Sequence, residues 1–121
     1  MDAEHPRRLP LPERLYHSCH NNPATVRDFW SWERIKGKEH PDPKQRENAQ
    51  GISTWGTLER ARAEAASSGA QGAWIAEIEL SSVQGVRCKQ TGKANHYTLW
   101  ADPQAFVDAK PAMHPVTEER R

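Results

Sequence analysis

Several features that would place a protein outside the cell or in a membrane are missing from this sequence. No apolar run approaches the roughly 18 residues that a membrane-spanning helix requires. The start of the chain, residues 1–12, is polar and rich in proline, with no apolar segment typical of a secretion signal. Two cysteines, Cys19 and Cys88, are too few for a disulfide framework. We therefore expect a cytoplasmic protein with reduced thiols and no membrane association.

The sequence also lacks an excess of either charge. It has 17 Lys and Arg against 16 Asp and Glu, a formal net charge of +1. No cluster supplies the positive field that nucleic-acid binding usually requires. The glycines are scattered rather than gathered in a phosphate-binding loop, and the segment 51–55 lacks the second glycine of a serine-nucleophile turn. These absences disfavour nucleic acid as a partner and exclude the common nucleotide-loop and serine-hydrolase motifs.

The composition that is present suits one small domain. Of the 121 residues, 36% are hydrophobic and 27% are charged, so the core is modest. Five tryptophans offset this, because each can bury about 200 Å². We expect residues 13–111 to form the domain, between a disordered leader (1–12) and a polar tail (112–121).

The pattern of apolar residues predicts an alternation of short strands and helices. Strands are expected at 14–19, 51–55, 73–80, 86–88 and 95–100, and helices at 25–37, 58–67 and 104–109. The segment 38–50 has almost nothing to bury and is expected to be a long surface loop, a candidate lid. Because strands and helices do not strictly alternate, the order predicts an α+β fold with a small, mainly antiparallel sheet and about three helices.

A metal site is one interpretation of the histidines and cysteines. His17, Cys19 and His20 are close in sequence, and Cys88 and His96 are further thiolate and imidazole ligands of the kind that Zn²⁺ prefers. None of the familiar ligand spacings is present, and His20 would not share a strand face with the other two. We therefore expect no metal.

Three short segments occur in a particular order along the chain. Tyr16-His17-Ser18 lies in the first expected strand, Gly51–Trp55 leads into an alanine-rich helix, and Asn95–Gln104 follows late. In this order the chain resembles the ADP-ribosyltransferase superfamily, in the branch of diphtheria toxin, the poly-ADP-ribose polymerases and the RNA 2′-phosphotransferases. From Leu15 to about Phe106 it is also similar to a group of small actinobacterial proteins, a likeness that concerns the fold and implies no activity.

The resemblance implies a cleft that binds NAD as a substrate. It assigns His17 to a ribose, because a neutral imidazole donates one hydrogen bond and accepts another. Ser18 stands where the family has a glycine whose backbone approaches the nicotinamide amide. Ser53 supplies a hydroxyl and Trp55 an aromatic wall that stacks on the nicotinamide ring. The neighbours Tyr16 and Tyr97 are assigned to the same site.

His96 is the main departure from the family, whose active members have a glutamate there. Glutamate stabilises the oxocarbenium character that develops as nicotinamide leaves, whereas a neutral histidine serves only to orient a nucleophile. A second carboxylate would come from Glu33, Glu77 or Glu79. The interpretation as an enzyme, a transferase or an NAD glycohydrolase with His17 and His96 as catalytic residues, requires both histidines to open into one cleft. Placement on opposite faces of the sheet would contradict it.

The alternative is a non-catalytic binding or interaction module with the same fold. Its pocket would take a small-molecule ligand or a protein partner.

Overall fold

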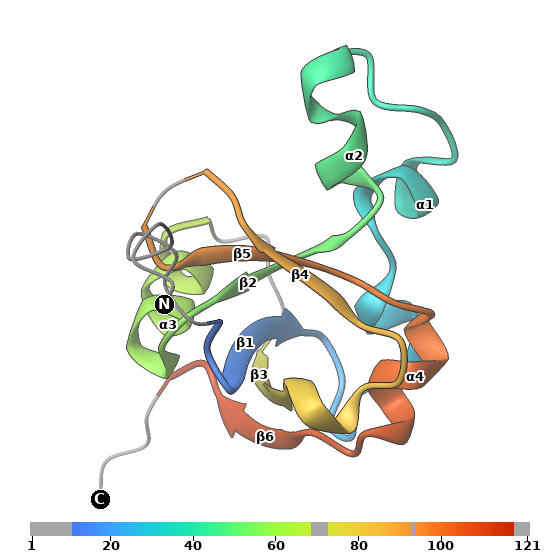
Figure 1. The fold of residues 1–121 in the computed structure, drawn as a ribbon. Helices are drawn as coiled ribbons and strands as arrows, with labels where there is room; N and C mark the ends of the chain where they lie inside the picture. The colour runs from blue at the N-terminus through green and yellow to red at the C-terminus, as the bar shows by residue number, and fades with distance from the viewer. Residues whose placement is uncertain (1–10, 69–72, 93, 118–121) are drawn as a thin grey trace, which may run out of the picture.

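The computed structural model describes residues 11–68, 73–92 and 94–117. In this described part of the chain, six strands form one antiparallel sheet in the order β4-β5-β2-β1-β3-β6 (Figure 1). The strands are β1 (Arg14–Cys19), β2 (Ile52–Trp55), β3 (Trp74–Glu79), β4 (Arg87–Gln90), β5 (His96–Trp100) and β6 (Ala112–Pro115). The helices are α1 (Trp32–Lys36), α2 (Arg46–Ala49), α3 (Leu58–Ser68) and α4 (Pro103–Asp108), with short 3₁₀ turns η1 (Val26–Phe29), η2 (Pro43–Gln45) and η3 (Leu80–Ser82). The expected α+β class with an antiparallel sheet is confirmed.

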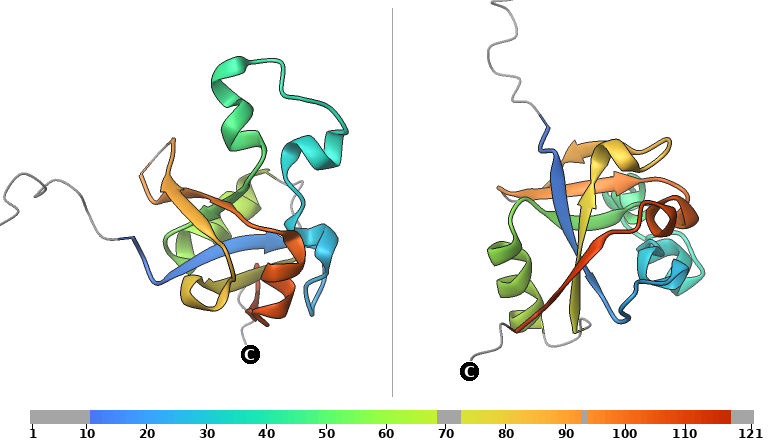
Figure 2. Two further views of the ribbon diagram at one scale, coloured as in Figure 1. Left: turned by 45° about the vertical axis from the view of Figure 1, so that its right-hand side comes forward. Right: turned by 90° about the horizontal axis from the view of Figure 1, so that it is seen from below.

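The sheet consists of two three-stranded halves that are joined at one place. β4, β5 and β2 form one half, and β1, β3 and β6 form the other. Between β2 and β1 the register has a single residue pair, Tyr16 with Trp55, after which the strands diverge. Viewed from below, β1 and β3 run across the direction of β2 and β5 (Figure 2). Side chains of the larger core, described next, fill part of the space that this divergence leaves between the two halves.

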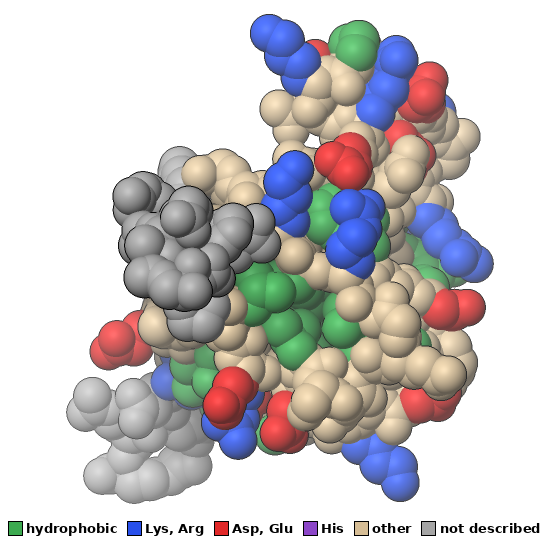
Figure 3. Space-filling model, in the orientation of Figure 1, with side chains coloured by type: hydrophobic (Ala, Val, Ile, Leu, Met, Phe, Trp, Pro, Cys, Tyr) green, Lys and Arg blue, Asp and Glu red, His purple; other side chains and the backbone are tan. Residues whose placement is uncertain are grey.

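Each face of the sheet has its own core. The larger core contains Leu15, Ile52, Ile78 and Leu99, and Phe29 of η1 and Phe106 of α4 complete it. On the opposite face, Ala61 and Ala65 of α3 pack on Ile75. Because side chains alternate along a strand, β3 contributes Ile75 to one core and Ile78 to the other. On the face of the molecule that Figure 3 shows, hydrophobic side chains are exposed near the centre, and Lys and Arg side chains gather at the top, over α2.

Three expected segments differ from the observed ones. The helix predicted for 25–37 is broken after Phe29, because Trp30 and Ser31 are extended and the Ser31 hydroxyl caps α1 by accepting from the Arg34 N–H. The predicted loop 38–50 contains η2 and α2. The predicted tail begins with β6, which pairs with β3 through the half-buried Met113, His114 and Pro115. Residues 1–10 of the predicted leader lie outside the described residues.

Asp28 fixes the turn between β1 and η1. Its buried carboxylate accepts hydrogen bonds from the backbone N–H of His20 (2.8 Å) and Thr25 (2.8 Å), and from the Asn21 amide (3.1 Å). Burial by itself would raise the pKa of Asp28, but these hydrogen bonds outweigh it and hold the pKa below its ordinary value. The carboxylate therefore stabilises the loop that carries η1 onto the core.

Both cysteines are free thiols. Burial raises the pKa of Cys19 to about 12, with the Asp28 charge acting in the same direction, so this thiol stays protonated at neutral pH. Within the described part of the chain, no helix has the length and apolar character needed to cross a membrane.

Replacement of Asp28 by Asn should destabilise the fold by about 1–3 kcal/mol at neutral pH, because two backbone donors lose a charged acceptor. The Asp28 pKa is lowered in the folded state, so its contribution is present above the unfolded pKa of about 4 and is lost as the pH falls through the folded pKa. The difference in melting temperature between the two proteins should therefore be largest at neutral pH and should shrink as the pH falls below about 4. The exposed Asp108→Asn variant is the control, and equal melting temperatures at pH 7 would contradict the prediction.

Candidate functional site

The site lies where β1 and β2 diverge. Beyond the pair Tyr16–Trp55, the Ser53 carbonyl of β2 has no ladder partner in β1 and instead meets the His17 side chain. His17 Nδ1 is 2.8 Å from Ser53 O, and Nε2 is 2.7 Å from Asp28 O. The ring also stacks on Phe29, with centroids 5.5 Å apart. His17 thus bridges the two half-sheets and η1 with one planar side chain.

Burial and hydrogen bonding have opposite effects on the pKa of His17. Carbonyl oxygens only accept hydrogen bonds, so a neutral imidazole, with one N–H, can satisfy one of them. Burial lowers the pKa of His17, and the hydrogen bonds to Ser53 and Asp28 and the Asp28 charge only partly oppose this. The neutral ring therefore predominates at neutral pH. Neither nitrogen is left over for a ligand in this arrangement.

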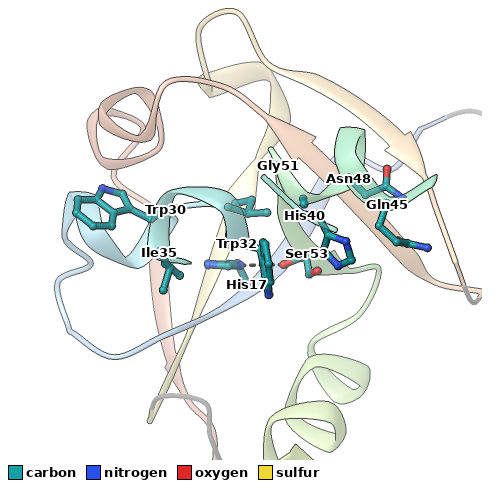
Figure 4. Close-up of a pocket in the computed structure, with 11 residues that line it drawn as sticks. His17, Trp30, Trp32, Ile35, His40, Gln45, Asn48, Gly51 and Ser53 are labelled. Atoms are coloured by element: carbon teal, nitrogen blue, oxygen red, sulfur yellow. Dashed lines mark hydrogen bonds between the residues drawn. The ribbon is translucent and has the colours of Figure 1, made fainter. Parts of the chain in front are cut away.

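A cavity of about 470 Å³ opens beside His17 (Figure 4). This is within the range of about 300–1,000 Å³ that is usual for small-molecule sites. Its aromatic lining is His17, Trp30, Trp32 and His40, its apolar lining is Ile35, Ala49 and Ile52, and its polar side chains are Gln45, Asn48 and Ser53. No Asp, Glu, Lys or Arg is among the described residues that line it. The cavity suits a flat, uncharged group with a polar edge.

Most of this lining comes from residues 31–50, which we call the arm. Figure 1 shows the arm, with α1 and α2, projecting beside the sheet. α1 ends at Gly37, whose positive φ of 72° favours glycine. The following turn brings His40 to Trp32, where the ring centroids are 4.6 Å apart and the planes are tilted by 47°. The Arg46 side chain donates to His40 O and holds this turn in place.

The arm is fastened to the sheet through Glu47. Its backbone carbonyl accepts a 2.8 Å hydrogen bond from Trp100 Nε1, and its carboxylate lies 3.2 Å from Arg87 Nη1. Gly51 then allows β2 to begin close to β5, because a Cβ there would lie 2.6 Å from Leu99 O. These contacts determine the distance between the arm and His17, and hence the width of the cavity.

The expectation that His17 and His96 open into one concavity is wrong. Tyr16 pairs with Trp55, and Trp55 pairs with His96. Residues directly opposite each other in an antiparallel sheet share a face, so these three lie together. His17 follows Tyr16 and points to the other face, where it meets Phe29. β2 also separates the strands of the two histidines.

Only some of the other expected site residues line the cavity. Ser53 and His17 line the cavity, whereas Trp55 and His96 form an edge-to-face pair with centroids 4.6 Å apart outside it. Burial raises the pKa of Tyr16, which lies beside Trp55, and Glu77 adds to the rise. The remaining two expected residues do not line the cavity. Tyr97 packs against the larger core, and the Ser18 hydroxyl is buried without a hydrogen-bond partner among the described residues.

His96 has structural partners of its own. Its Nδ1 lies 2.9 Å from Thr91 O, to which an N–H would donate, and 3.0 Å from the Thr91 hydroxyl. These contacts close the turn between β4 and β5. The three carboxylates considered as partners do not line the cavity: Glu77 contacts Arg14 and His114, Glu79 is exposed, and Glu33 accepts from the His40 backbone.

The sequence interpretation missed Trp30 and four residues of the arm as lining residues. Trp30 and Trp32 lay in the expected helix 25–37, and His40, Gln45 and Asn48 lay in the segment 38–50, whose polarity predicted a loop. The available signal was two tryptophans close before a segment that carries a histidine and amide side chains. Within the described ranges, no three His, Cys, Asp or Glu side chains gather as metal ligands.

Comparison with known proteins adds no assignment: no family model, curated protein or solved structure matches the chain.

His17→Ala should lower the free energy of unfolding by about 2–3 kcal/mol, because the ring's hydrogen bond to a backbone carbonyl and its stacking on Phe29 are both lost. The His17 pKa is lowered in the folded state, so its contribution is complete above the unfolded pKa of about 6.5 and declines as the pH falls through the folded pKa. The difference in melting temperature between the two proteins should therefore be larger at pH 8 than at pH 5. The exposed neighbour variant His20→Ala should show neither effect. A His17→Ala protein as stable as the wild type would contradict the bridging role.

Proposed function

We propose that this protein is a non-catalytic binding domain for a ligand with a planar heterocycle, and that NAD is the first ligand to test. The observation that carries the proposal is the cavity at the divergence of β1 and β2, with its aromatic pair and uncharged lining. Trp32 and His40 supply ring faces for stacking. Gln45 and Asn48 supply amide donors and acceptors of the kind that read the edge of a base or a carboxamide.

The motif order supports NAD among such ligands. The segments that resemble ADP-ribosyltransferases fall on β1, β2 and β5, which are consecutive across the sheet. Two of the residues assigned by that resemblance, His17 and Ser53, line the cavity. The ligand would therefore lie beside the first two motifs and against the arm, away from Trp55 and His96.

Binding without turnover fits the site better than transfer of ADP-ribose. Loss of nicotinamide builds positive charge on the ribose, which an enzyme stabilises with a negative group placed in advance. No carboxylate is among the described residues that line the cavity. His96, in the position of the family glutamate, lies on the opposite face of the sheet and contacts Thr91 and Trp55.

NAD titrated into the protein should change its tryptophan fluorescence in a saturable way. Trp32→Ala should weaken this binding about 5- to 150-fold, because a lost base–aromatic stack costs about 1–3 kcal/mol. Trp55→Ala is the matched control, since Trp55 lies outside the cavity and should leave the affinity unchanged. The absence of saturable binding would overturn the proposal.

His96→Ala separates binding from catalysis. We expect the wild type to release no nicotinamide from NAD, and the variant to bind NAD as the wild type does. The variant should lose about 1–2 kcal/mol of stability with the Thr91 and Trp55 contacts. Release of nicotinamide by the wild type that disappears in His96→Ala would instead support an enzyme.

A further inference from the structure

A second, smaller cavity adjoins the first at the start of β2. It has a volume of about 110 Å³ and shares Gly51 and Ile52 with the larger one. On the side of the arm it is lined by the arm residues Ser31 and Arg34. Its floor is apolar and includes Phe29 and Leu99. Among the described residues that line these two cavities, Arg34 is the only Lys or Arg.

Arg34 also contacts Trp30, a residue that lines the larger cavity. Its guanidinium carbon lies 4.9 Å from the centroid of the Trp30 ring, and that of Arg27 lies 5.3 Å from the same ring. Both arginines are exposed, and no carboxylate of the described residues is within ion-pair distance of either one. Two positively charged side chains thus lie over Trp30 without an ion-pair partner among the described residues.

The larger cavity has two chemically different ends. In Figure 4, Trp30 and Ile35 lie at one end, Gln45 and Asn48 lie at the other, and His17 and Trp32 lie between them. The side chains that line the amide end are uncharged, whereas Arg27 and Arg34 lie over the Trp30 ring at the other end. A nucleotide has the same polarity, with a neutral heterocycle at one end and an anionic phosphate joined through a ribose.

We infer that Arg34 binds a phosphate of the ligand, so the site takes phosphorylated nucleotides in preference to nucleosides or free bases. The inference rests on the proposed function and specifies its ligand class. A guanidinium presents parallel N–H donors that match two phosphate oxygens, and its charge shortens and strengthens those hydrogen bonds. Cation–π attraction to the Trp30 ring holds the Arg34 guanidinium next to a residue that lines the larger cavity.

The test compares three ligands that share the neutral adenine heterocycle: NAD, the mononucleotide AMP and the riboside adenosine. Calorimetric titration of the wild type should give at least tenfold tighter binding of the two phosphorylated ligands than of the riboside. The preference should weaken as salt is raised from 50 to 300 mM, because exposed charges are screened. Arg34→Gln should remove most of the preference while leaving riboside binding unchanged, and Arg34→Lys should restore part of it.

Arg60→Gln is the matched control, because the Arg60 guanidinium also lies over a tryptophan, Trp55, at 5.3 Å, but on the other face. It should leave all three affinities unchanged. Thermal melts establish that each variant is folded. Equal affinities for riboside and mononucleotide, or an unchanged preference in Arg34→Gln, would overturn the phosphate role while leaving the proposed function intact. If none of the three ligands binds, both the inference and the proposed function fail.

Discussion

The divergence of β1 from β2, bridged by the His17 side chain, is the constraint from which the rest of this structure follows. An antiparallel pair normally continues its ladder until one strand ends, because unpaired backbone groups are costly when buried. Here the ladder has one pair, Tyr16 with Trp55, and the Ser53 carbonyl is met by an imidazole instead. The two half-sheets can then cross, with the larger core between them and a cavity at their edge.

The anchoring of η1 follows from the same arrangement. His17 reaches the Asp28 carbonyl, while the Asp28 carboxylate gathers the N–H groups of His20 and Thr25. Phe29 is thereby placed between the rings of His17 and Phe106, which connects the turn to α4. The residue that resembles a family ligand-binding histidine therefore has a structural role that occupies both of its nitrogens.

The arm gives the cavity its chemical character. Its helices are too short to be stable by themselves, and their positions depend on a few polar contacts. The Trp100–Glu47 hydrogen bond and the Glu47–Arg87 ion pair connect the arm to the sheet. The Arg46 hydrogen bond to the His40 carbonyl shapes the turn within it. A binding surface built in this way can place aromatic and amide groups around a ligand without contributing to the main core.

The sequence by itself determined the class of the fold and most of its elements. The alternating residues of 74–79, the strand-forming residues of 96–100 and the Asp102-Pro103 start of α4 identify these elements because their signals are local. The sequence did not determine which side chains share a face across three strands, since the register of β1, β2 and β5 depends on pairing partners far apart in the chain. It also did not determine that the polar segment 38–50 folds against Trp32. Only the tertiary structure separated His17 from His96 and brought the arm to His17, because both arrangements depend on non-local contacts.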